Sequence, residues 1–347
     1  MNSHLVLFLF GIIFNTLTIQ SCRGENITLR GTMINPNLNE EDFRVLASWN
    51  ANLIRWQLSW PGNTADNATV AEYETWLGTA LEQFDSMLPV LRQLNLKIVL
   101  DLHTPPGGGN WQTFYRLWTE KQFQDCFLSV WEMMSHRYQN ESQIIAYDIL
   151  NEPDDHSLVP GLMNWRDLAI AVVQRIRSID SQHAIICEAS PLAVSNTLPK
   201  FEPLPFDNVI YSFHMYEPYD FTYQNLFSNV TPIYYPGPIR GMMWNKDKLR
   251  SLLQPNVQWQ RTYNVSIYVG EFSAIRWAPG NSTANYLSDL IELYEEFGWN
   301  WTYHAFREFQ GWDVEMIGDK DHPQRSPTPT DRQLLLMKWF QKNKHEI

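Results

Sequence analysis

Apolar positions recur along the chain in two alternating patterns. Short runs of β-branched and aromatic residues predict eight strands, at residues 27–32, 52–58, 96–102, 144–150, 184–187, 209–213, 266–269 and 299–304. The starts of these runs lie about forty residues apart on average, which leaves room after each strand for a loop and a returning helix, as parallel sheets require. The pattern therefore predicts an α/β fold built from repeated strand and helix units.

Segments of helical period separate the runs. Residues 165–176 and 286–294 place apolar side chains at i, i+3, i+4 and i+7, which is typical of helices that cover a sheet. Asn39 and Asp42 predict a capped helix start, and Gly298 predicts a helix end before the last strand. Eight units in 347 residues favour a closed (β/α)8 TIM barrel over an open doubly wound sheet.

Composition limits the domain count and the kind of partner. Hydrophobic residues make up 44% of the chain and charged residues 18%, a balance typical of a folded core. No repeat, linker or charge block divides residues 25–347, so we expect a single domain, present as a monomer. The formal net charge of -12 disfavours nucleic acid and anionic membranes as partners, because both attract basic surfaces. A neutral or cationic ligand fits better.

The first residues are typical of a targeting segment. Residues 5–14 form an apolar run that is too short to cross a bilayer as a helix but has the length of a signal-peptide core. We therefore predict a signal peptide over residues 1–22 and secretion of the mature chain. The residues before Cys22 also permit a lipoprotein signal, with a lipid anchor on that cysteine. After processing we expect no membrane-spanning segment.

Sequons and cysteines bear on the same question. Seven N-x-S/T sequons begin at Asn26, Asn67, Asn140, Asn229, Asn264, Asn281 and Asn300. Chance would give about three, so the excess supports an exported glycoprotein. Asn300 lies in an apolar run, and we expect it to be unmodified. Cys22, Cys126 and Cys187 lack the paired spacing of a zinc site and permit at most one disulfide.

Polar residues stand at the ends of several predicted strands. Arg55 lies inside the second run, and a buried guanidinium requires an anionic partner. His103 follows the third run, Glu152 the fourth, His214 the sixth and Glu271 the seventh. Functional groups of a closed parallel barrel gather where its strands end, so we expect these side chains to meet in one pocket.

Two of these residues are carboxylic acids, which suggests a specific reaction. Cleavage of a glycosidic bond needs one acid to protonate the leaving oxygen and a second to meet the developing positive charge at carbon. We interpret Glu152 as acid/base and Glu271 as nucleophile. Arg55 would keep Glu271 ionised, while repulsion between the carboxylates would keep Glu152 protonated. Retention of configuration would require the two groups about 5–5.5 Å apart.

Five motifs carry a resemblance to a known family: Asn-Leu-Ile-Arg at 52–55, Leu-Asp-Leu-His at 100–103, Ile-Leu-Asn-Glu-Pro at 149–153, His-Met-Tyr at 214–216 and Val-Gly-Glu-Phe at 269–272. Their order and strand positions resemble those of the family 5 glycoside hydrolases, the cellulase family, over most of the mature chain. The resemblance implies a catalytic (β/α)8 barrel over residues 25–347 that acts without a cofactor or a metal.

The resemblance also implies roles for individual residues. It makes Glu152 the acid/base, Asn151 a hydrogen-bond partner of the sugar 2-hydroxyl, and Glu271 the nucleophile. The supporting polar residues would be Arg55, His103, His214 and Tyr216, with Tyr216 in contact with the nucleophile.

The family places a tryptophan under the sugar at the end of strand eight. We assign this platform to Trp301, although the segment 307–312 can supply it instead. Trp111, Trp277 and Trp312 follow predicted strands and are candidates for stacking on sugars. The glycine-rich residues 104–111 lack the lysine and spacing of a phosphate loop, and we interpret them as a wall of the cleft.

These observations predict a secreted, retaining glycoside hydrolase that cleaves β-linked polysaccharide, most like an endo-β-1,4-glucanase. β-Mannanase and exo-acting β-glucosidase-type activity on the same scaffold are alternatives, because the loops at 216–244 and 304–330 decide whether the cleft is open. A non-catalytic carbohydrate-binding barrel is a further alternative. A metal-dependent barrel hydrolase is disfavoured, since no histidine lies between His4 and His103.

Overall fold

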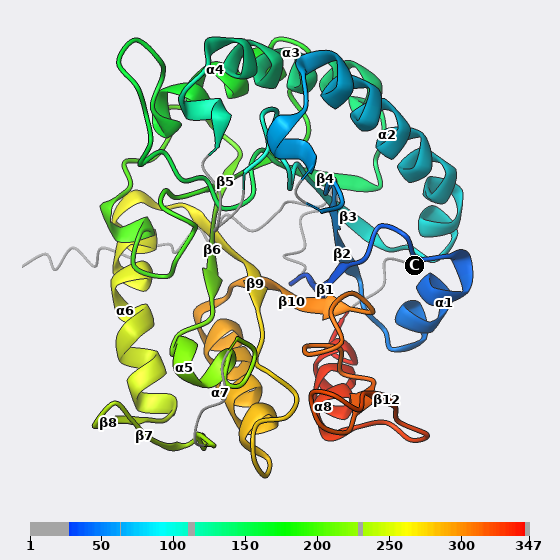
Figure 1. The fold of residues 1–347 in the computed structure, drawn as a ribbon, viewed down its shortest axis with the longest axis vertical. Coiled ribbons are helices and arrows are strands. Elements are labelled where there is room, and N and C mark those ends of the chain that lie inside the picture. Colours follow the sequence, from blue (N-terminus) through cyan, green and yellow to red (C-terminus); the bar gives the residue numbers. More distant parts are fainter. Residues whose placement is uncertain (1–27, 63, 110–114, 228–231, 344–347) are drawn as a thin grey trace, which may run out of the picture.

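Eight parallel strands close into a barrel in the computed structural model, which describes residues 28–62, 64–109, 115–227 and 232–343 (Figure 1). Around the ring the order is β1, β2, β3, β4, β5, β6, β9 and β10. Their bounds are Arg30–Ile34, Leu53–Gln57, Lys97–Asp101, Ile144–Asp148, Ala184–Glu188, Val209–Met215, Ser266–Phe272 and Asn300–Phe306. The predicted closed (β/α)8 barrel is confirmed, and each predicted run overlaps one of these strands.

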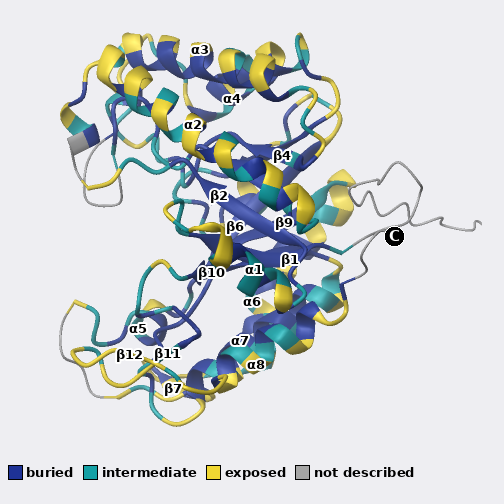
Figure 2. Ribbon diagram, turned by 90° about the vertical axis from the view of Figure 1, so that its right-hand side faces the viewer, coloured by how far each residue is buried: buried dark blue, intermediate teal, exposed yellow. Residues whose placement is uncertain are grey.

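Helices cover the outside of the barrel. They are α1 (Glu40–Ser48), α2 (Val70–Gln93), α3 (Lys121–Tyr138), α4 (Trp165–Arg177), α6 (Lys246–Tyr263), α7 (Ser282–Phe297) and α8 (Asp331–Phe340). Figure 2 shows buried strands at the centre and helices whose outward faces are exposed. The predicted caps are confirmed: Asn39 and Asp42 form a capping box at α1, and Gly298 ends α7 with a φ of 73°.

Short elements that the periodicity does not predict occupy the loops. They are the 3-10 helices η1 (Thr64–Asn67), η2 (Arg116–Trp118) and η3 (Leu198–Lys200), the short helix α5 (Tyr219–Thr222), and the two-stranded pairs β7 (Gly237–Ile239) with β8 (Met242–Trp244) and β11 (Met316–Ile317) with β12 (Gln324–Arg325). Each is too short for a period to be read. Three of them, α5, β7 and β8, lie in the segment after β6, and β11 and β12 lie in the segment after β10.

The interior of the barrel has an apolar layer and a charged layer. The apolar layer consists of Leu29, Leu53, Val99, Ala146, Ala184, Ile186, Ile210 and Tyr268. Side chains of a strand alternate between its two faces, so the next inward residue lies two positions later. From Leu53, Val99, Ala146 and Ile186 that step leads to Arg55, Asp101, Asp148 and Glu188, all buried. The same alternation therefore places apolar side chains in one layer of the interior and charged side chains in the next.

Several predictions made from the sequence bear on export. The predicted signal peptide, Cys22, Asn26 and Asn229 lie outside the described residues. Within the described ranges, no helix is long and apolar enough to cross a membrane. Cys126 and Cys187 are buried and form no disulfide in the part of the chain that the structure describes.

The described sequons fall into two groups. Asn67, Asn140, Asn264 and Asn281 are exposed, whereas Asn300 is buried. The Asn300 side chain accepts a hydrogen bond from the backbone nitrogen of Leu29 at 2.8 Å. That geometry agrees with the expectation that Asn300 is unmodified.

Candidate active site

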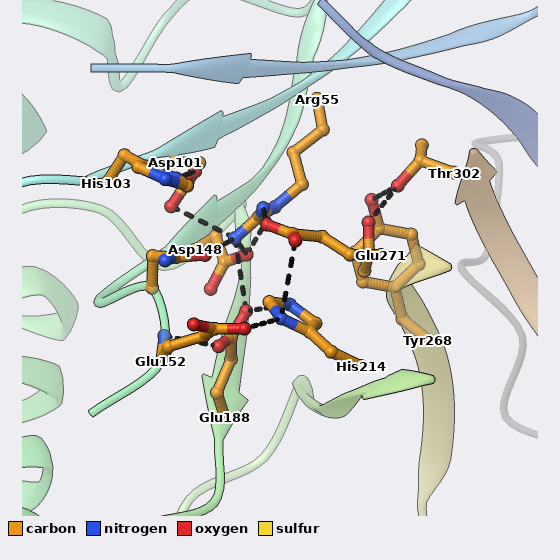
Figure 3. A network of polar contacts seen from close by, with 12 residues as sticks. Arg55, Asp101, His103, Asp148, Glu152, Glu188, His214, Tyr268, Glu271 and Thr302 are labelled. Carbon is orange, nitrogen blue, oxygen red and sulfur yellow. Dashed lines mark hydrogen bonds and ion pairs between the residues drawn. The ribbon is translucent and has the colours of Figure 1, made fainter. Parts of the chain in front are cut away.

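Arg55, from β2, lies at the centre of the polar network and is fully buried (Figure 3). Its guanidinium forms ion pairs with Asp101 at 3.2 Å, Asp148 at 2.9 Å, Glu188 at 3.1 Å and Glu271 at 2.7 Å. Burial alone would lower the pKa of Arg55, but these four carboxylates raise it well above its usual value. Arg55 is therefore a permanent cation, with the anionic partners that its position requires.

Glu271, at the end of β9, is surrounded by hydrogen-bond donors. Its Oε1 accepts from Arg55 at 2.7 Å, and its Oε2 accepts from the Tyr216 hydroxyl at 2.7 Å. The Nδ1 atoms of His304 and His214 lie 3.0 and 3.7 Å from Oε2. Burial opposes ionisation, but His214, His304 and Arg55 outweigh it and hold the pKa of Glu271 well below its usual value. The expected contact with Tyr216 and the expected ion pair with Arg55 are both present.

Glu152 follows β4 and is more open than Glu271, with 27% of its side chain exposed. Its Oε1 lies 2.8 Å from His214 Nδ1. Its backbone adopts a φ of 42°, a left-handed conformation that costs on the order of 1–3 kcal/mol for a residue other than glycine. The Glu152 backbone nitrogen donates to Glu188 Oε2 at 2.7 Å, so a buried carboxylate holds the strained turn.

His214, from β6, connects the two halves of the network. Its Nε2 lies 3.0 Å from Glu188 Oε1, and its Nδ1 faces Glu152 and Glu271. Burial would lower the pKa of His214, but Glu188 and Glu271 raise it well above its usual value. The histidine is therefore cationic at neutral pH and lies between carboxylates on three different strands or strand ends (Figure 3).

The remaining polar residues also reach this site. His103 follows β3, and its Nδ1 lies 2.8 Å from Asp101 Oδ2. Burial would lower the pKa of His103, but Asp101 outweighs it and raises that pKa. The Asn151 side-chain oxygen accepts from Arg55 at 3.0 Å. The structure thus brings seven of the eight predicted site residues together, namely Arg55, His103, Asn151, Glu152, His214, Tyr216 and Glu271.

Trp301 is the exception, and its assignment as the sugar platform is wrong. The inward positions of β10 are Asn300, Thr302 and His304, so Trp301 points outward toward the helices. It is 0% exposed, and its Nε1 donates to Glu295 Oε1 of α7 at 2.9 Å. A residue that is fully covered by helices cannot stack on a substrate.

The alternative segment 307–312 places a tryptophan at the site instead. The Trp312 ring is partly exposed, lies 4.6 Å from the ring of His304 and is stacked with Tyr216 at 5.7 Å. Trp277 is partly buried, and its Nε1 donates to the backbone oxygen of Gln224 at 2.9 Å. Trp111 lies outside the described residues.

Four buried residues of the network were not predicted as site residues from the sequence: Asp101, Asp148, Glu188 and His304. Asp101, Asp148 and Glu188 each lie two positions after an inward apolar residue of their strand, and His304 lies two positions after the inward Thr302. Alternation applied strand by strand from Arg55 is the signal that identifies them.

One set of groups in this network can share a cation. Among the described residues, one side-chain atom each of Glu152, His214 and Glu271 lie within 4.8 Å of one another. Both nitrogens of His214 already face carboxylates, at 2.8 Å for Glu152 and 3.0 Å for Glu188. A metal would therefore have to displace existing ion pairs, and we assign no cofactor to the site.

A closed parallel barrel with two carboxyl groups meeting at its mouth defines a class of sugar-cleaving enzymes. The family model for cellulase (glycosyl hydrolase family 5) matches residues 20–309. Endoglucanase C of Acetivibrio thermocellus is 27% identical over 296 residues, covering 77% of this chain and 84% of its own. Cellodextrinase A of Ruminococcus flavefaciens is 22% identical over 269 residues, covering 75% and 76%.

Solved structures agree on the fold. Cel5A of Thermotoga maritima in complex with cellobiose matches with a TM-score of 0.69 at 21% identity, over 89% of this chain and 97% of that chain. The cellulose synthase subunit Z of Clostridioides difficile matches with a TM-score of 0.68 at 20% identity, over 89% and 99%. The chain therefore belongs to the cellulase family, glycosyl hydrolase family 5, as the motifs predicted. It is a glycoside hydrolase.

Proposed function

We propose that the protein is a secreted, retaining endo-β-1,4-glucanase that cuts β-linked polysaccharide by double displacement. The observation that carries this proposal is the approach of two side chains, since a carboxylate oxygen of Glu152 and one of Glu271 lie within 4.8 Å of each other. Retaining enzymes hold their carboxyl groups about 5–5.5 Å apart, whereas inverting enzymes leave about 6.5–9.5 Å for a water. The short separation supports retention.

In the first step, ionised Glu271 forms a bond to the anomeric carbon while the glycosidic C–O bond breaks and the leaving oxygen takes a proton from Glu152. The donors around Glu271 suit a nucleophile that must be ionised before substrate binds. In the second step, water attacks the same carbon and gives its proton to Glu152, and the bond to Glu271 breaks. The partial exposure of Glu152 suits a group that exchanges protons with substrate and water.

Aromatic residues after β6 support a polymeric substrate. Tyr219 and Phe227 are 47% and 67% exposed. Tyr223 lies between Tyr216 and Phe227, with ring centroids 5.5 and 6.3 Å away. Such rings stack on the apolar faces of sugars, and a row that extends from the reacting site can hold several units of one chain. The endoglucanase names of the relatives favour β-1,4-glucan within this class.

Export is part of the proposal. The predicted signal peptide and four exposed sequons, at Asn67, Asn140, Asn264 and Asn281, support a secreted glycoprotein. We expect a monomer. Expression in a eukaryotic secretory host, followed by glycosidase treatment and mass spectrometry, tests modification at these positions, and an unmodified product at all four would contradict it.

The mechanism is tested by exchanging the two glutamates. We expect Glu271→Ala to abolish turnover of an aryl β-cellobioside, and added azide to restore it with formation of the α-glycosyl azide. We expect Glu152→Ala with azide to give the β-glycosyl azide instead, because the nucleophile is still present. Glu132→Ala, an exposed glutamate on α3, is the matched control and should keep full activity. A fully active Glu271→Ala variant would contradict the proposed mechanism.

The substrate is tested by the pattern of products. An endo-acting β-1,4-glucanase lowers the viscosity of carboxymethylcellulose with few new reducing ends. Faster release of reducing ends from mannan, or release of single sugars alone, would contradict the substrate and the mode of attack but not the mechanism.

A further inference from the structure

The inward residue at the end of β10 is a histidine held between two carboxylates. His304 Nδ1 lies 3.0 Å from Glu271 Oε2, and His304 Nε2 lies 3.2 Å from Glu308 Oε2. His304 is only 8% exposed, and the Trp312 ring covers it at a centroid distance of 4.6 Å.

The carboxylates on both sides of His304 favour the form in which both of its nitrogens carry a proton. The Tyr216 hydroxyl donates its hydrogen to Glu271 Oε2 at 2.7 Å, so the same hydroxyl presents a lone pair to His304 Nδ1. Nδ1 therefore faces two acceptors, and Nε2 faces the carboxylate of Glu308. A neutral imidazole has one N–H, but an imidazolium has two. Burial would lower the pKa of His304, yet Glu271 and Glu308 raise it to about 10.

We propose that His304, held by Glu308, is a positioning residue that acts on the reaction through Glu271, as a fixed cation that keeps the nucleophile ionised and oriented. This inference rests on the proposed role of Glu271. It assigns functions to two residues, His304 and Glu308, that the sequence motifs do not include.

The pairing with Glu308 matters because the charge on Glu271 changes during the reaction. When the bond to the anomeric carbon forms, Glu271 becomes a neutral ester, and a cation with no other partner would be left buried and uncompensated. Glu308 keeps His304 paired in that intermediate. When the ester bond then breaks, the electron pair returns to Glu271, and His304 stabilises the carboxylate as it leaves. The second step should therefore depend on His304 more than the first.

Other groups also face Glu271, so the effect of His304 is partial. Arg55 approaches from β2, His214 from β6 and Tyr216 from the segment after β6, and Glu152 lies across the site. These groups remain when His304 is replaced. Glu271 should then still ionise, but at a higher pH.

Two variants separate the effect of the charge on His304 from the effect of its shape and packing. In His304→Asn the amide can keep a neutral donor near the position of Nδ1, and Glu308→Gln keeps the shape of a side chain that is 27% exposed. We expect His304→Asn to move the acid limb of kcat/KM for 2,4-dinitrophenyl β-cellobioside upward by about 1–2 pH units. We expect kcat for this activated substrate to fall about tenfold or more, because the second step limits it.

The control is an exposed pair of the same chemistry. His322 Nδ1 lies 2.9 Å from Asp319 Oδ1, and both side chains are exposed. His322→Gln should leave the rate and the pH profile unchanged. A His304→Asn variant whose circular dichroism and melting match the wild type, but whose acid limb does not move, would overturn the proposal even if its rate were lower.

A second readout does not depend on turnover. In ¹⁵N-histidine NMR of the wild type, His304 should remain doubly protonated at pH 8, and its titration should move to lower pH in Glu308→Gln. A neutral His304 at pH 8 would overturn the proposal. If the wild type cleaved no β-glucoside, the proposed substrate would fail while the NMR titration still decided the charge of His304.

Discussion

The Arg55 guanidinium lies within 3.2 Å of four carboxylates, those of Asp101, Asp148, Glu188 and Glu271. One cation does not neutralise four anions in a buried space, so other groups must share the balance. Burial and Glu188 raise the pKa of Asp148, which favours its neutral form, and His214 supplies a second cation. The network is therefore a set of coupled charges, and removal of one member leaves its partners unpaired.

Loss of the central cation should be severe. We expect Arg55→Met to lower the free energy of unfolding in urea by about 3–5 kcal/mol, because it leaves buried carboxylates without their counterion. Arg44→Met removes an arginine of equal size that pairs with Glu40 on the surface, and it should cost no more than about 1 kcal/mol. Equal unfolding midpoints for these two variants would contradict this account of the network.

At the scale of single elements, β10 and the segment after it each contain a tryptophan, Trp301 and Trp312, and the two have different roles. Trp301 faces outward, with its ring stacked on Phe340 of α8 at 5.7 Å. Trp312 faces the site beside Tyr216 and His304. The first stabilises the attachment of helices to the barrel, and the second can contact a sugar.

This division predicts that replacing Trp301 mainly lowers stability, whereas replacing Trp312 mainly lowers activity. Trp301→Phe should lower the free energy of unfolding by about 1–3 kcal/mol through lost volume and the lost hydrogen bond to Glu295, with kcat/KM nearly unchanged. Trp312→Ala should lower kcat/KM on cellotetraose by about tenfold, the loss expected for one stacking contact, with a much smaller change in stability. Kinetics and urea unfolding on both variants test this, and a catalytic defect confined to Trp301→Phe would contradict it.

Strand and helix periods predicted the barrel well, because both report directly on burial. Strand ends were less accurate: the first strand was predicted at 27–32 and runs from Arg30 to Ile34, because apolar runs do not mark where ladder pairing with β2 and β10 begins. The hairpins β7–β8 and β11–β12 could not be predicted, since two or three residues per strand carry no measurable period.

Site residues could be predicted from the sequence where a motif marks the end of a strand. They were harder to predict where only the alternation of inward and outward positions along a strand indicates them. Glu152 and Glu271 lie two residues after the predicted runs 144–150 and 266–269, within the motifs Asn-Glu-Pro and Gly-Glu-Phe, and were identified. Asp148 and Glu188 lie within or at the end of such runs, and their inward direction follows only when the register of a strand is fixed. The platform was misassigned because aromatic composition does not tell which face of β10 a residue occupies. Trp301 and His304 differ by an odd number of positions and so lie on opposite faces.

At the scale of the whole molecule, one end of the barrel interior is apolar and the other is charged. The apolar layer from Leu29 to Tyr268 supplies stability that does not depend on pH. The charged layer holds protons that the unfolded chain would release. His214 and His304 both have a raised pKa, with that of His304 at about 10, against about 6.5 for unfolded histidine.

This difference fixes the sign of the pH dependence. Below about pH 6.5 both histidines are protonated in both states, and their contribution to stability is fully present. Above it the unfolded chain releases two protons that the folded chain keeps, so stability falls by about 1.4 kcal/mol per pH unit for each histidine that stays protonated. Asp148, whose pKa is raised by burial and Glu188, acts in the same direction.

We therefore expect the free energy of unfolding in urea to be higher at pH 6 than at pH 8, a range that lies below the pKa of about 8.5 of an unfolded cysteine. Glu271→Gln should flatten this slope, because Glu271 is a carboxylate that raises the pKa of both His214 and His304. His322→Gln should keep the wild-type slope, since its pairing with Asp319 is exposed. A stability that does not change between these pH values, or the same slope in Glu271→Gln, would mean that the buried charges are not coupled through Glu271. Coupling of this kind would make the proposed nucleophile also the residue through which the stability of the fold depends on pH.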